Sequence, residues 1–121
     1  MAKTILVVDD SSSLRQIVRS ALVGAGYTVL EAADGQAALD FLDGRSINMT
    51  ICDLNMPVLD GIEFVKAAKS RPNYKFMPIM MLTTETQDAK REKGREAGAR
   101  AWMVKPFAPT QLIKAVDKIC P

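Results

Sequence analysis

The chain has 121 residues, a length that supports one compact domain, and its 48% hydrophobic and 25% charged residues are typical of a folded globular protein. It contains no histidine, which excludes Ser-His-Asp and Cys-His catalysis and zinc sites built on imidazole. The net charge of +2 is unevenly distributed, because residues 1–60 carry 4 basic and 8 acidic side chains and residues 61–121 carry 12 basic and 6 acidic ones. Any chemistry must therefore rest on carboxylates, hydroxyls and lysine.

Five runs of β-branched and large apolar residues predict strands at 4–8, 27–30, 49–52, 78–82 and 101–104. Their apolar character is nearly continuous, which is typical of strands covered on both faces in a parallel sheet. Helices are predicted between them. Apolar residues at positions 14, 17, 18, 21 and 22 form one helical stripe that ends at Gly24, and a similar stripe covers 112–119.

Residues 35–42 and 61–70 predict two further helices. The segment 87–97 predicts a weaker helix with a mostly solvated surface, because its apolar positions are only Ala89 and Ala97 and because Gly94 costs roughly 1 kcal/mol relative to alanine in a helix interior. Strands and helices thus alternate. The sequence predicts an α/β fold, a (βα)5 doubly wound parallel sheet with right-handed crossovers.

The two cysteines, Cys52 and Cys120, have no metal-binding spacing, and one pair cannot form a disulfide scaffold. The longest apolar stretches, 5–8 and 76–82, are far shorter than the ~20 residues of a membrane span. No signal peptide is recognisable at the start of the chain. We therefore expect free thiols and a cytoplasmic location.

Polar side chains follow four of the five predicted strands, at the point where each strand ends. They are Asp9 and Asp10, Asp53, Thr83 and Thr84, and Lys105. The carboxyl ends of parallel strands lie at one edge of the sheet, where ligands bind in α/β proteins. Three carboxylates, two hydroxyls and one ammonium should therefore converge there.

Each of these residues alone also has a structural interpretation. Asp10 or Ser11 can cap the first helix, and Asp53 can cap a turn. The threonines can be strand formers, and Lys105 can extend from the rim of the sheet. Their joint occurrence at strand ends favours a functional interpretation.

Three carboxylates in one cleft repel one another, so the cluster requires protonation or a cation. An all-oxygen site with few protein donors suits Mg²⁺. A hard cation, a lysine and a threonine hydroxyl around one carboxylate form a phosphoryl-transfer site in which an aspartate is the nucleophile. Asp9 and Asp10 are the natural metal ligands, which leaves Asp53 as the acceptor.

Together these motifs resemble the receiver domain of two-component response regulators. The matching residues are Asp9-Asp10 after the first strand, Asp53-Leu54-Asn55-Met56-Pro57 with Asp60-Gly61, Thr83, and Lys105-Pro106-Phe107, at spacings of 44, 30 and 22 residues. The resemblance covers essentially the whole chain. It implies one receiver domain over residues 1–121 with no output domain, and the strand order 2-1-3-4-5 of flavodoxin and CheY.

The resemblance also implies individual roles at the site. Asp53 would accept a phosphoryl group from a phosphohistidine on a partner kinase. Asp10, Asp53 and the backbone carbonyl of Asn55 would bind Mg²⁺ directly, and Asp9 would bind it through water. Lys105, joined to Pro106 by a cis peptide bond, would pair with the phosphoryl group.

Other matching residues would control the response. Thr83 resembles the switch hydroxyl of receivers, and Asn55 and Glu85 occupy the positions that tune hydrolysis of the phosphoryl group. Trp102 stands where the family usually has a smaller aromatic residue that moves on activation. It can equally be a half-exposed aromatic residue of a strand.

The chain is most similar to single-domain chemotaxis regulators of the CheY type. The resemblance implies a CheA-like histidine kinase, a flagellar motor switch protein or another acidic target peptide, and a phosphatase as partners of a monomer. It implies no nucleic acid, no membrane insertion and no enzyme activity beyond its own phosphorylation and dephosphorylation. The basic excess of residues 86–121, with 8 Lys and Arg against 4 Asp and Glu, supports an acidic partner.

Three alternatives remain at the level of the sequence. A phosphorelay intermediate or phosphate sink would use the same chemistry. A flavodoxin-like electron carrier shares the topology but needs an anion loop rich in glycine and hydroxyl groups after the first strand, where this chain has Asp9 and Asp10. A phosphatase of the haloacid dehalogenase type needs a D-x-D pattern on the first strand, which is absent.

Overall fold

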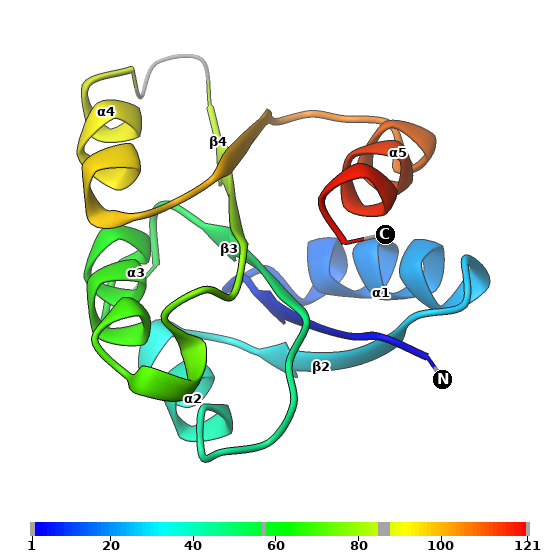
Figure 1. Cartoon of the computed structure of the whole chain (residues 1–121). Coiled ribbons are helices and arrows are strands. Elements are labelled where there is room, and N and C mark those ends of the chain that lie inside the picture. Colours follow the sequence, from blue (N-terminus) through cyan, green and yellow to red (C-terminus); the bar gives the residue numbers. More distant parts are fainter. Residues whose placement is uncertain (1, 57, 85–87, 121) are drawn as a thin grey trace.

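A computed structural model describes residues 2–56, 58–84 and 88–120. Five parallel strands form one sheet in the order β2-β1-β3-β4-β5, as predicted. Helices α1 and α5 cover one face of the sheet and α2, α3 and α4 cover the other (Figure 1). The elements are β1 Thr4–Val8, α1 Ser12–Gly24, β2 Thr28–Ala32, α2 Gly35–Phe41, β3 Met49–Asp53, α3 Gly61–Lys69, η1 Pro72–Tyr74, β4 Ile79–Thr83, α4 Asp88–Ala97, β5 Ala101–Val104 and α5 Pro109–Ile119.

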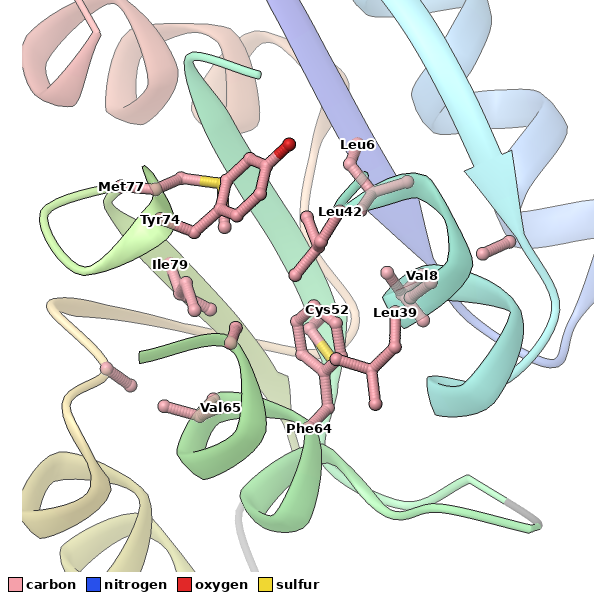
Figure 2. Close-up of a cluster of buried hydrophobic side chains, with 14 of the residues drawn as sticks. Leu6, Val8, Leu39, Leu42, Cys52, Phe64, Val65, Tyr74, Met77 and Ile79 are labelled. Carbon is pink, nitrogen blue, oxygen red and sulfur yellow. The ribbon is translucent and has the colours of Figure 1, made fainter. Parts of the chain in front are cut away.

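The continuous apolar strands are explained by two hydrophobic cores, one on each face of the sheet. Leu6 and Val8 of β1 belong to the core under α2 and α3, whereas Ile5 and Val7 belong to the core under α1 and α5. Figure 2 shows the first of these cores, with Phe64 of α3 among the strand side chains. Alternate residues of one strand therefore serve opposite cores, and a polar residue would be buried on either face.

Within the described residues, three helices begin at a side-chain cap. Ser11 accepts a hydrogen bond from the backbone N–H of Leu14 at the start of α1, which makes Ser11 rather than Asp10 the cap of that helix. Asp34 and Asp60 cap α2 and α3 in the same way. The caps satisfy backbone donors that have no partner within the helix.

Two predicted strands lie slightly displaced in the structure, since β2 extends to Ala32 and β4 to Thr83. Ala32 pairs with Val8 and Thr83 pairs with Val104, so the ladder continues past the apolar runs that the sequence shows. The short helix η1 was not predicted. It places the buried hydroxyl of Tyr74 against the loop before β3.

The remaining expectations concern α4, the cysteines and the helix lengths. Helix α4 is mostly exposed along its described length, and position 87 lies outside the described residues. Cys52 and Cys120 are both free and buried. Among the helices of the described part of the chain, none is long and apolar enough to cross a membrane.

Candidate functional site

The predicted site residues lie at the ends of four adjacent strands. Asp9 follows β1, Asp53 is the last residue of β3, Thr83 is the last residue of β4, and Lys105 follows β5. Because β1, β3, β4 and β5 are neighbours in a parallel sheet, these residues share one edge. The structure thus brings together side chains that are up to 96 residues apart in sequence.

Three carboxylates form the centre of the site. Asp9, Asp10 and Asp53 each place a carboxylate oxygen within 4.8 Å of the others. Asp9 is 1% exposed and Asp53 is 8% exposed, whereas Asp10 faces solvent. Burial, followed by repulsion from Asp9, raises the pKa of Asp53 more than Lys105 lowers it.

Lys105 connects the two buried carboxylates. Its Nζ lies 3.2 Å from Asp9 Oδ2 and 3.2 Å from Asp53 Oδ1. Burial by itself would lower the pKa of Lys105, but attraction by Asp53 and Asp9 outweighs that effect and raises the pKa. The peptide bond between Lys105 and Pro106 is cis, as the resemblance implies.

The donor set fits a hard divalent cation. One ammonium faces three carboxylates, so the site is short of positive charge, and all three carboxylates supply oxygen. Mg²⁺ prefers oxygen ligands and retains several bound waters. Asp10 is exposed to solvent, so waters can reach the ion on that side of the site. Asp9, Asp10 and Asp53 would hold the ion.

Neighbouring residues fix the carboxylates in place. The Oδ1 atom of Asp9 accepts a hydrogen bond of 2.8 Å from the backbone N–H of Ser11. The guanidinium of Arg15 donates to the backbone carbonyl of Asp9 and pairs with Glu31. The end of β3 is packed closely against α3, because a Cβ atom at Gly61 would lie 2.5 Å from the carbonyl oxygen of Asp53. Only glycine fits there without displacing the strand end.

A pocket beside the carboxylates is lined by Asp10, Asn55, Met56 and Asp60. Asn55 is exposed, and its side-chain oxygen accepts a hydrogen bond of 3.0 Å from Lys90 Nζ of α4. Sequence reasoning did not find Lys90. No sequence pattern predicts this contact, because the distance from Lys90 to Asn55 depends on how α4 is oriented against the β3–α3 loop.

Of the two predicted switch residues, Thr83 ends the strand next to that of Asp53, whereas Trp102 pairs with Met81 inside the sheet. Thr83 is 3% exposed, and Trp102 is half-buried on β5. The indole of Trp102 packs on α4, with the guanidinium carbon of Arg91 5.6 Å from its ring centroid. Glu85, the second predicted hydrolysis residue, lies outside the described residues.

Comparison with known proteins identifies the family to which this chain belongs. The family model of the response regulator receiver domain matches residues 5–117. The chain belongs to that family. Receiver domains are signalling modules that interact with histidine kinases and with targets, and they are not classical enzymes. The family match therefore excludes the flavodoxin-like electron carrier.

Several relatives of this receiver have chemotaxis names. A CheY homologue of Campylobacter jejuni is 38% identical over 117 residues, which cover 95% of this chain and 90% of the relative. The structure of the chemotaxis response regulator CheY4 of Vibrio cholerae superimposes with a TM-score of 0.93 at 46% identity, covering 98% of this chain and 99% of that one. The receiver is thus similar in sequence and in fold to chemotaxis regulators.

A more distant receiver bears on the metal. The receiver domain of sensor histidine kinase PA1611 from Pseudomonas aeruginosa, described with a magnesium ion coordinated in the active site cleft, has a TM-score of 0.91 at 26% identity and covers 99% of this chain and 98% of its own. Receiver domains generally bind Mg²⁺ at an acidic pocket. The three carboxylates described above form such a pocket here.

Proposed function

We propose that this chain is a response regulator receiver that accepts a phosphoryl group on Asp53 from a histidine kinase. The observation that carries the proposal is the position of Lys105, whose ammonium lies 3.2 Å from carboxylate oxygens of both Asp9 and Asp53. In the transfer, the N–P bond of the phosphohistidine breaks as an O–P bond to Asp53 forms. Lys105 holds a positive charge where the phosphoryl oxygens arrive.

The other groups of the site have complementary roles in this proposal. Asp10, Asp53 and the Asn55 carbonyl would bind Mg²⁺ directly and Asp9 would bind it through water, and the ion would supply the positive charge that Lys105 alone does not provide. The hydroxyl of Thr83, at the end of the neighbouring strand, donates to a phosphoryl oxygen. The chain supplies these groups itself, so a small phosphodonor should replace the kinase.

The phosphorylated protein would signal by binding a chemotaxis target in the cytoplasm more tightly than the unphosphorylated protein does. The named relatives support this assignment, because proteins similar over most of their length are chemotaxis regulators. The exposed face of α4 carries Lys90, Arg91, Lys93 and Arg95, which suits an acidic amphipathic peptide such as a flagellar motor switch protein would offer. A CheA-like kinase and a phosphatase would load and unload Asp53.

The experiment is incubation with acetyl phosphate and Mg²⁺ followed by intact-protein mass spectrometry. One phosphoryl group should be added to the protein with Mg²⁺ and none when the ion is chelated. Asp53→Asn should remove the modification, whereas Asp40→Asn, an exposed carboxylate on α2, should retain it. Equal labelling of Asp53→Asn and the unchanged protein would refute the assignment.

Target binding is tested separately. Affinity for an acidic amphipathic peptide should rise when a phosphoryl mimic and Mg²⁺ are added, and it should fall as the salt concentration increases. Equal affinity with and without the mimic would refute the switch. Duplex DNA bound as tightly as the peptide would refute the choice of partner.

A further inference from the structure

Helix α4 is attached directly to the rim of the candidate phosphorylation site. Lys90, in the first turn of α4, donates from Nζ to the side-chain oxygen of Asn55 at 3.0 Å, across 35 residues of sequence. Asn55 lies two residues beyond Asp53 and lines the same pocket as Asp10. The contact therefore joins helix α4, which is proposed to bind the target, to the residue two positions after the phosphoacceptor.

The chemistry of the two side chains determines the orientation of the amide. A lysine ammonium can only donate, so the oxygen branch of the Asn55 amide must be the one turned toward Lys90. One of the two acceptor lone pairs of the carbonyl oxygen is then used by Lys90, and the NH₂ branch points the other way. Without Lys90 the exposed amide could rotate and offer its oxygen to another donor.

Such a donor is present when an aspartyl phosphate is hydrolysed. In that reaction a bond forms between phosphorus and the oxygen of water, and the bond from phosphorus to the Asp53 oxygen breaks. A proton of the water passes to an oxygen of the departing inorganic phosphate, and Asp53 is left as a carboxylate. A free amide oxygen close to Asp53 could accept a hydrogen bond from the attacking water and orient it. An amide oxygen held by Lys90 cannot do so to the same extent.

We propose that Lys90 is a positioning residue that prolongs the phosphorylated state by holding the side-chain oxygen of Asn55. The proposal rests on phosphorylation of Asp53, and it makes the lifetime of the phosphoryl group depend on the position of α4. Apart from the contact with Trp102, the described side chains of α4 are mostly exposed. A partner that binds this helix would therefore change the lifetime of the phosphoryl group by changing the contact between Lys90 and Asn55.

Three variants test the contact by the rate at which labelled phosphoryl group is lost from Asp53 in Mg²⁺. Lys90→Met keeps a long side chain and good helix propensity but removes the donor, and it should shorten the half-life by about two- to fivefold, the effect of one solvent-exposed hydrogen bond. Lys90→Arg keeps donors and charge and should stay close to the unchanged protein. Lys66→Met, an exposed lysine on α3, is the matched control and should not alter the half-life.

A second readout follows the Asn55 amide itself, without any phosphoryl group. The ¹⁵N-correlated signals of the Asn55 side-chain NH₂ should move in Lys90→Met and remain in place in Lys66→Met. An amide that moves without a change in half-life would overturn the positioning role, as would an amide that does not move. A protein that takes up no phosphoryl group at all, in any variant, would instead refute the proposed function, while the amide signals would still report on the contact.

Discussion

The indole ring of Trp102 packs on the backbone of α4 at Gly94. A Cβ atom at position 94 would lie only 2.4 Å from the Cη2 atom of the indole, closer than side chains pack in proteins. Arg91, one turn earlier on the helix, completes the contact with its guanidinium over the ring. Helix α4, which has few apolar residues, thus contacts β5 through one large aromatic side chain and a glycine that makes room for it.

Gly94→Ala should therefore destabilise the protein even though alanine is the better helix former. Helix propensity alone would favour alanine by about 1 kcal/mol. Overpacking against the indole costs about 1–3 kcal/mol and should reverse the sign. Urea unfolding followed by circular dichroism measures the free energy of unfolding, and Trp102 emission should shift to longer wavelength as the ring is displaced.

The matched test is the same substitution in a Trp102→Phe background. Phenylalanine lacks the outer indole ring, so Gly94→Ala should become neutral or stabilising by up to about 1 kcal/mol there. Equal effects of Gly94→Ala in the two backgrounds would show that the indole does not require glycine.

Gly94 also shows how far the sequence can predict this fold. The strands could be predicted because apolar runs are local in the sequence. The site could be predicted because the carboxyl ends of parallel strands share an edge, which places Asp53 and Lys105 close together. Gly94 was interpreted as a weakness of the helix, because its contact comes from a different element. Lys90 was missed for the same reason, since the orientation of α4 relative to Asn55 is a property of packing.

Phosphorylation should change the environment of Trp102. It is the only tryptophan in the chain, and it lies on β5 beside the strand that ends at Thr83. If Thr83 moves toward a phosphoryl group, the contact of the indole with α4 is biased toward one of two conformations. Emission and quencher accessibility should therefore change on adding beryllium fluoride with Mg²⁺, and Thr83→Val should suppress the change. An unaltered spectrum would mean that Trp102 is only a packing residue.

Asp53→Asn should stabilise the protein in the absence of Mg²⁺. Burial and Asp9 raise the pKa of Asp53, so the folded state holds a proton on this carboxyl at a pH where the unfolded chain has lost it. Its charge therefore costs stability as pH rises above the ordinary value of 3.8. At pH 7 the variant should be more stable by about 1 kcal/mol, an ordinary size for a single substitution, and the advantage should vanish in acid.

Addition of Mg²⁺ should reverse this order. A ligand that binds only the folded state stabilises it by about 2.7 kcal/mol at 100 times its Kd. Asp53→Asn removes one carboxylate of the three-carboxylate cluster and should gain less from the ion. Thermal unfolding midpoints of both proteins across a Mg²⁺ titration check the prediction. Parallel curves would argue that Asp53 does not take part in metal binding.

The hydroxyl of Tyr27, just before β2, donates a hydrogen bond to the carboxylate of Asp117 on α5 and should give a pH-dependent contribution to stability. Burial, with the bond to Asp117 as the next cause, raises the pKa of Tyr27 to about 12 from its ordinary value of 10.0. The folded state therefore keeps its proton between these two values while the unfolded chain loses it. Stability from this contact is complete below pH 10 and declines as pH rises toward 12.

Tyr27→Phe should accordingly cost about 0.5–1.5 kcal/mol at pH 7 to 9, the contribution of one hydrogen bond, and progressively less above pH 10. Denaturant unfolding of the variant and the unchanged protein in parallel at each pH isolates this difference from other titrations. Tyr74→Phe is the control, because the buried hydroxyl of Tyr74 hydrogen-bonds the backbone of Gly44 and Arg45 instead of a carboxylate. That variant should be destabilised because it leaves a backbone donor and acceptor without their partner. A Tyr27→Phe effect that is constant to pH 12 would mean that Asp117 does not hold the phenol proton.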